Sequence, residues 1–117
     1  MTAKYRVNDS GVAKARELID AHQYVLESSW SDEAPSADEE NADIDRHDWD
    51  QYGDWHLAID TEASEDTKDR FGFPFGDFRR VHRSALIAAK VRASQNDHDE
   101  IENVADELLQ HLDDVRS

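Results

Sequence analysis

The sequence predicts an all-α fold, a compact bundle of three long helices plus one or two short ones, in a single helical domain over residues 1–117. Three observations support this fold class. Apolar residues recur at helical spacing in three long segments. No segment alternates apolar and polar residues convincingly, so no sheet is expected. The chain contains no cysteine, and 117 residues are enough to bury one core without disulfides.

The first long helix is predicted to begin after Ser10, a favourable N-cap residue, and to end near Ser29. Its apolar side chains fall on one arc of the helical wheel, whereas its acids lie outside that arc. The residues on the arc are Val12, Ala15, Leu18, Ile19, Val25, Leu26 and Trp30. The segment is therefore expected to turn one face towards the core.

Two short helices are expected in the middle of the chain. Ser36 and Glu39 have the spacing of a capping box, which predicts a helix that ends near Arg46. Asp48 is expected to cap the next helix, which continues to about Leu57.

The second half of the chain is expected to supply the central helices. Residues 60–70 are hydrophilic and predict a loop. The run FGFPFG at 71–76 contains three phenylalanines that require burial, and its glycines and proline break regular structure, so it is predicted as a loop folded into the core. Asp77 is expected to cap a long helix at 78–94, which is nearly apolar all round at 84–91 and therefore central, and the last long helix spans 99–115.

The charge balance constrains the partners of the protein. The chain carries 28 acids, 18 of them Asp, against 13 Lys plus Arg, which gives a net charge of −15. Such an excess of carboxylates is typical of proteins from salt-accumulating cells, where salt screens the repulsion. Ordinary acidity in a high-GC genome and mimicry of DNA are the alternatives. Direct binding to nucleic acid is not expected, because phosphate contacts need clustered cations.

Residues 78–96 contain no acid, and their bases are Arg79, Arg80, Arg83, Lys90 and Arg92. Two interpretations of this cationic segment remain open. The arginines can form ion pairs with acidic neighbouring helices, because a guanidinium group binds carboxylates bidentately. Alternatively, they form an anion site for a phosphate, nucleotide or carboxylate ligand.

A second cluster, at 47–56, holds two Trp, one Tyr, two His and three Asp. Amphipathic aromatic side chains in this density are common at interfaces and in ligand pockets, and they also fill the cores of small domains. His82 lies within the cationic segment, and its imidazole is either a general base or a packed core group. The candidate ligand-binding residues are Trp55, His56, Arg79, His82 and Arg83.

No recognisable catalytic or metal-binding set is present in the sequence. Asp43 with His47 and Glu107 with His111 have the i,i+4 spacing that two ligands on one helical face would need. Neither Glu-x-x-His on a helix nor His-Glu-x-x-His occurs, so no metal is expected. A nucleophile elbow and a phosphate-binding glycine-rich loop are also missing. The sequence therefore assigns no catalytic residue and no cofactor.

Two strings in the sequence, WHL at 55–57 and GDFRRVHR at 76–83, carry a family resemblance. The segment from about Tyr24 to Leu112 resembles a group of small acidic proteins from high-GC bacteria and salt-adapted archaea. This group has no known function, so the resemblance implies a free-standing domain and no activity, cofactor or catalytic residue.

The expected function is that of a non-enzymatic interaction or assembly protein of a salt-adapted cell, acting as a homodimer or with another protein partner. A small anionic-ligand-binding protein or unrecognised enzyme is the first alternative, and an acidic DNA-mimic regulator is the second. No apolar run approaches the roughly 18 residues needed to span a membrane, and no signal peptide is evident, so a cytoplasmic location is expected.

The charge pattern makes a testable prediction about stability. Added NaCl should raise the melting temperature, because screening relieves repulsion among the outer carboxylates. The same screening weakens exposed ion pairs between the cationic segment and its neighbours. Thermal melting followed by circular dichroism in a NaCl series measures the balance, and a melting temperature that falls with salt would show that the exposed pairs dominate.

Overall fold

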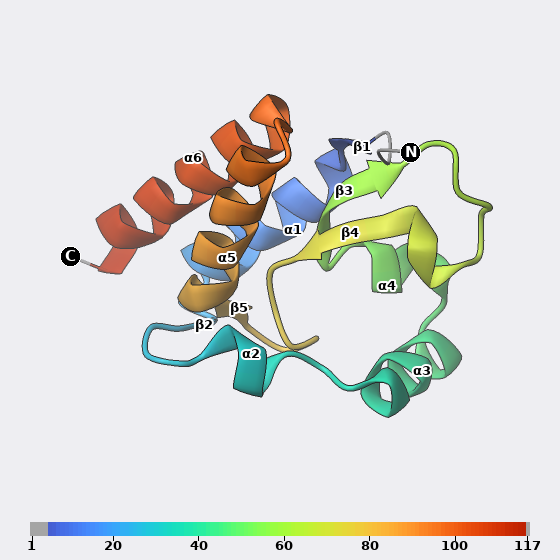
Figure 1. The fold of residues 1–117 in the computed structure, drawn as a ribbon. Coiled ribbons are helices and arrows are strands. Elements are labelled where there is room, and N and C mark those ends of the chain that lie inside the picture. Colours follow the sequence, from blue (N-terminus) through green and yellow to red (C-terminus); the bar gives the residue numbers. More distant parts are fainter. Residues whose placement is uncertain (1–4, 117) are drawn as a thin grey trace.

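The computed structural model describes residues 5–116, and it contains two sheets as well as helices (Figure 1). The prediction of an all-α helical bundle is therefore wrong. Strands β1, β3 and β4 form an antiparallel sheet in the order β1-β3-β4, and β2 pairs with β5 in parallel. In the described part of the chain, no helix is long and apolar enough to cross a membrane.

The strands are short, and most of their partners are distant in sequence. Their bounds are β1 Tyr5–Val7, β2 Tyr24–Val25, β3 His56–Asp60, β4 Phe71–Pro74 and β5 Val81–His82. Within the larger sheet Val7 faces Ala58, and Ala58 faces Gly72 on its other side. Strands of two to five residues are too short to show the alternation that identifies a strand in a sequence.

Three long helices and several short ones complete the fold. Their bounds are α1 Asp9–Asp20, α2 Trp30–Glu33, α3 Ala37–Arg46, α4 Trp49–Gly53, α5 Arg83–Gln95 and α6 Asp99–Arg116, with a 3₁₀ turn at Lys68–Arg70. The expected capping box is confirmed: the Glu39 amide donates to Ser36 Oγ over 3.2 Å, and the Ser36 amide donates to the Glu39 carboxylate. The Gln51 amide donates to Asp48 Oδ1, as predicted for the cap of α4.

The first helix ends nine residues earlier than predicted, at Asp20. His22 adopts a left-handed backbone with φ 59°, its amide donates to the Ile19 carbonyl, and the Gln23 amide donates to the Leu18 carbonyl. These two hydrogen bonds form a Schellman motif, which closes a helix and turns the chain away from its axis. The chain then continues into β2.

The helix predicted up to Leu57 ends instead at Gly53, and β3 begins at His56. Asn8 stabilises the turn between α4 and β3, because its side-chain amide donates to the Gly53 and His56 carbonyls over 2.9 and 3.0 Å. Helix α1 approaches the same strand closely. A Cβ at Gly11 would lie 1.9 Å from the His56 carbonyl oxygen, so only glycine fits there.

The helix predicted from Phe78 begins five residues later, at Arg83. Asp77 does cap backbone amides, but they belong to a tight turn: its Oδ1 accepts from the amides of Arg79 and Arg80 over 3.0 and 2.8 Å. Phe78 has φ 69° in this turn, which is incompatible with the first turn of a helix.

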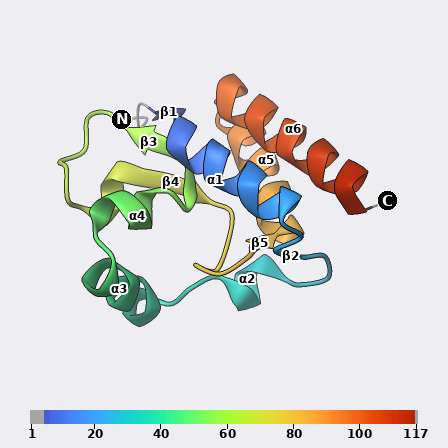
Figure 2. The same ribbon diagram turned by 180° about the vertical axis from the view of Figure 1, so that it is seen from behind.

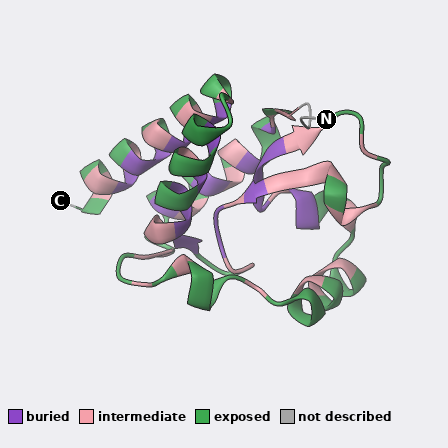
Figure 3. Ribbon diagram, in the orientation of Figure 1, coloured by how far each residue is buried: buried purple, intermediate pink, exposed green. Residues whose placement is uncertain are grey.

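The core lies between the helix pair α5–α6, helix α1 and the sheet (Figures 2 and 3). The inner face of α5 is made of small residues together with Leu86, and this allows α6 to pack closely along its length. The fully buried larger side chains include Ile19, Tyr52, Leu57, Phe75, Leu86, Ile101, Leu108 and Leu112. Figure 3 shows that α2 and the outer surface of α3 remain exposed.

Candidate functional site

The aromatic cluster contributes to the core. Trp55 is 6 % exposed and packs against Phe75 and Phe78, with ring centroids 5.6 and 5.9 Å away. The Lys14 ammonium lies 5.1 Å from the centroid of the Trp55 ring and forms a cation–π contact. Trp55 therefore fills space and holds a neighbouring lysine.

His56 is also buried, at the start of β3. Its Nδ1 lies 3.1 Å from the Tyr52 carbonyl oxygen, and the two rings are 4.8 Å apart. Burial lowers the pKa of His56 to about 4, even though hydrogen bonds with the Tyr52 and Gly53 backbone favour the charged form. The ring is thus neutral at ordinary pH, and it faces protein groups.

His82 is 2 % exposed and forms hydrogen bonds with both ring nitrogens. Nε2 lies 2.9 Å from Asp77 Oδ2, and Nδ1 lies 2.9 Å from Ser28 Oγ, which in turn contacts Ser84 Oγ. Desolvation raises the pKa of Asp77, but hydrogen bonds from His82 and from the Arg80 and Arg79 amides outweigh it, so the net pKa lies below its usual value.

The set Asp77, His82 and Ser28 has the groups of a serine-nucleophile relay, but its surroundings differ from those of such a site. The hydroxyl of Ser28 is bonded to Ser84, and Ser28 is lined up with His82 through Nδ1, the nitrogen that usually faces the carboxylate. Neither of the cavities described below is lined by Ser28 or His82. The geometry gives this set the role of joining three segments of the chain.

The two predicted arginines lie on different surfaces. Arg83, at the start of α5, binds Asp113 of α6 bidentately, with Nε and Nη2 at 3.0 and 3.1 Å from the carboxylate oxygens. Arg79, in the turn before β5, is exposed and lines a cavity beside α3. The five candidate residues therefore do not share one pocket: Trp55 and His56 lie in the core, and His82 lies beneath the turn.

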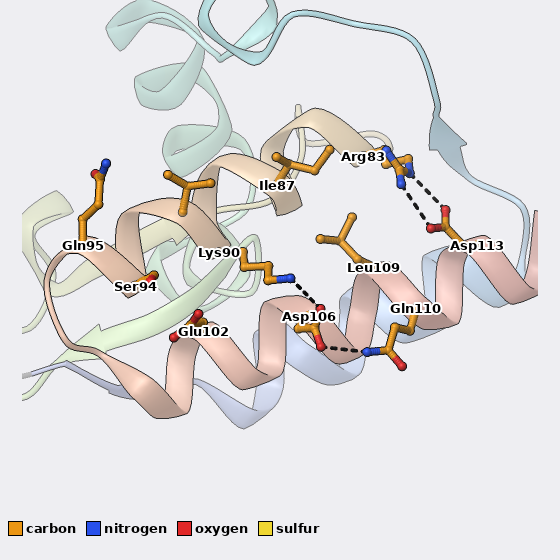
Figure 4. A pocket seen from close by; sticks show the side chains of 11 residues that line it. Arg83, Ile87, Lys90, Ser94, Gln95, Glu102, Asp106, Leu109, Gln110 and Asp113 are labelled. Atoms are coloured by element: carbon orange, nitrogen blue, oxygen red, sulfur yellow. Dashed lines mark hydrogen bonds and ion pairs between the residues drawn. The ribbon is translucent and has the colours of Figure 1, made fainter.

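The largest of the cavities we describe is a groove of about 550 Å³ over α5 and α6 (Figure 4). We call this surface the α5–α6 face. Its central apolar residues are Ile87 and Val91 of α5, which are 41 % and 49 % exposed, and Leu109 of α6. Its charged residues are Arg83, Lys90, Glu102, Asp106 and Asp113.

The charges of the α5–α6 face are segregated by helix. Helix α5 has three bases and no acid, whereas α6 has seven acids and one base. Because the helices are antiparallel, Arg83 pairs with Asp113 at one end, and Lys90 Nζ lies 2.8 Å from Asp106 Oδ1 at the middle. The expected ion pairing of the cationic segment with an acidic helix is confirmed for these two residues.

The apolar run at 84–91 indicated this surface in the sequence, but helical periodicity did not show which of its residues face outwards. The run SALIAAKV at 84–91 is apolar apart from Ser84 and Lys90, and its inner face is filled by residues such as Ala85 and Ala89. Ile87 and Val91, four residues apart, are therefore directed outwards. An apolar helix that packs on one side only exposes apolar residues on the other.

Neither of the two possible metal-ligand pairs is joined by a third ligand among the described residues. Asp43 Oδ1 lies 3.8 Å from His47 Nε2, whereas His111 Nε2 lies 2.6 Å from Asp20 Oδ1 of α1 and not from Glu107. Within residues 5–116, no group of three or more His, Cys, Asp or Glu side chains is arranged to hold a metal ion.

Comparison with known proteins adds no assignment. No family model matches the chain, and no curated protein or solved structure shows significant similarity to it. The resemblance to small acidic proteins through the WHL and GDFRRVHR strings stays a prediction.

The burial of His56 predicts a loss of stability on acidification. The unfolded chain takes up a proton near the usual pKa of 6.5, whereas folded His56 takes it up only near pH 4, so the unfolded state is favoured as the pH falls between these values. This one group then costs up to about 3 kcal/mol of unfolding free energy. Denaturant unfolding at several pH values measures the loss, with NMR of the His56 ring as the direct readout.

A His56→Gln variant is the matched control, because glutamine cannot take up the proton. Its stability should fall less over the same pH interval than that of the natural protein. A His56 ring that titrates close to pH 6.5 would contradict this account of its burial.

Proposed function

We propose that this protein is a non-enzymatic interaction protein that associates with a second copy of itself through the α5–α6 face, in the salt-rich cytoplasm of its cell. One observation carries the proposal. Among residues 5–116, the large apolar side chains that are most exposed are Leu26, Ile87 and Val91, and two of these lie one helical turn apart on this face. Apolar residues gathered in a groove with a charged rim are typical of interaction surfaces.

The charge pattern of the face supports a second copy as the partner. A two-fold axis parallel to the helices would place the basic α5 of each copy over the acidic α6 of the other. Arg83 of one copy would then face Asp113 of the other, and Lys90 would face Asp106, because each pair lies at one level along the helices. The apolar side chains of both copies would meet between these charges (Figure 4).

The overall charge supports association at high ionic strength. Two copies that each carry −15 repel one another in dilute buffer. At about 1 M salt the Debye length is about 3 Å, so this long-range repulsion is lost, whereas contact between apolar groups persists. The predicted dimer is therefore favoured at high ionic strength, which the acidic composition indicates for the cell. No specific observation favours a DNA mimic.

Sedimentation equilibrium in about 1 M NaCl tests the proposal, since electrostatic repulsion is screened there. The natural protein should sediment as a dimer, and Ile87→Asp should be a monomer. Leu26→Asp is the matched control, because it places the same charge at an exposed apolar position outside the groove. Thermal melting of each variant checks that it is folded.

Two results would contradict the proposal. One is a natural protein that stays monomeric throughout the concentration range, and the other is a Leu26→Asp variant that dissociates as readily as Ile87→Asp. A charge swap adds a test of the geometry. Arg83→Asp and Asp113→Arg, made in separate chains, should each weaken the dimer about tenfold, and a mixture of the two variants should restore it, because opposite charges then face each other only between copies.

A further inference from the structure

A separate cavity of about 200 Å³ lies between α3 and the turn at 77–80. Helix α3 lies at the rim of the molecule beside α4 (Figures 1 and 2). The Tyr52 hydroxyl of α4 donates to Glu40 of α3 over 3.1 Å, and Lys68 Nζ lies 3.4 Å from the same carboxylate. These contacts hold α3 against the body of the protein and give the cavity a fixed wall.

Asp43 of α3 lines this cavity, and one oxygen of its carboxylate has no hydrogen-bond partner, whereas the other, Oδ1, lies 3.8 Å from His47 Nε2. The side chain is only 9 % exposed, and Oδ2 is buried without a hydrogen-bond partner. Desolvation raises the pKa of Asp43, although the nearby His47, Lys14 and Arg46 favour its charged form. Buried polar atoms are almost always hydrogen-bonded in folded proteins, so Oδ2 needs a donor that the described residues do not supply.

Arg46 and Arg79 bring positive charge to the same cavity. Both side chains are exposed, so their guanidinium groups are open to a ligand. Arg79 is held there by a strained turn: Phe78 has φ 69°, and the Asp77 carboxylate binds the Arg79 amide. A left-handed conformation is unfavourable for a bulky residue and persists only where the surroundings enforce it.

The mixture of charges selects the class of ligand. A simple anion would satisfy the two arginines but would be repelled by Asp43 and by Glu39, which also lines the cavity. A simple cation would be attracted by Asp43 and Glu39 but repelled by the two arginines. A molecule with both an ammonium and a carboxylate group would supply the donors that Asp43 lacks and accept from the guanidinium groups, which bind carboxylates bidentately.

We therefore propose that this cavity binds a small zwitterion of the free amino acid class, with its ammonium group at Asp43, its carboxylate at Arg79 and Arg46, and its side chain against Phe78. The site shares no lining residue with the α5–α6 face, so it does not depend on self-association.

Titration of the isotope-labelled protein with L-alanine, acetate and methylammonium, followed by amide NMR, tests the proposal. L-Alanine should shift the amide resonances of Asp43, Arg79 and their neighbours in a saturable way. Acetate and methylammonium should each bind at least about tenfold more weakly, because each satisfies only one side of the site. The same titration of Ile87→Asp should give the same result, since that substitution lies outside the site.

Variants identify the two halves of the site. Asp43→Asn and Arg79→Gln should each weaken L-alanine binding about tenfold or more. Asp45→Asn and Arg80→Gln are the matched controls, because these exposed neighbours do not line the cavity. Arg79 is exposed, so its variant keeps the test valid if Asp43→Asn does not fold. The proposal is overturned if L-alanine causes no saturable shift, or if acetate binds as tightly as L-alanine.

Discussion

The buried ring of His82 is hydrogen-bonded to Asp77 through Nε2 and to Ser28 through Nδ1, each over 2.9 Å. Because a carboxylate can only accept, Nε2 carries a proton and donates it to Asp77. In the neutral ring Nδ1 is then an acceptor, and the Ser28 hydroxyl donates to it. A single residue in the short strand β5 thus joins the segment after β2, the turn at 77–80 and the start of α5.

Both surfaces depend on this junction. On one side, Asp77 accepts from His82 through one carboxylate oxygen and orders the backbone of Arg79 through the other. On the other side, Arg83 follows His82 directly and begins the helix that carries Ile87 and Val91. The start of α5 is therefore anchored through the same residue that orders the turn beside the cavity. Breaking it would leave buried hydrogen-bonding groups unsatisfied, which costs more than the hydrogen bonds contribute when formed.

Signals that act within a few residues were readable from the sequence, whereas signals that depend on distant partners were not. The capping box at Ser36 and the start of α6 at Asp99 are local, and both are found where they were expected. The strands were missed because each is short and pairs with a distant segment, as β1 does with β3, where Tyr5 lies opposite Asp60. Asp77 was expected to cap a helix, but the amides it binds belong to a turn and not to the helix.

The candidate sites show the same division. The pairing of the basic segment with acidic helices could be anticipated from charge, and Arg83 with Asp113 bears it out. The outward direction of Ile87 could not be anticipated, because it depends on which face of α5 the alanines occupy. The unpartnered carboxylate oxygen of Asp43, Oδ2, could not be anticipated either, because it depends on the positions of all its neighbours.

Hydrogen–deuterium exchange of a His82→Ala variant tests the central role of this residue most directly, with Leu108→Ala of α6 as a control that also removes a buried side chain. Amides of Arg79, Arg80 and the first turn of α5 should lose protection together with those around Ser28, while the β3–β4 ladder keeps its protection. Leu108→Ala should not cause a selective loss of amide protection in these segments. Protection that falls evenly over the whole chain, or only within the turn, would contradict the account.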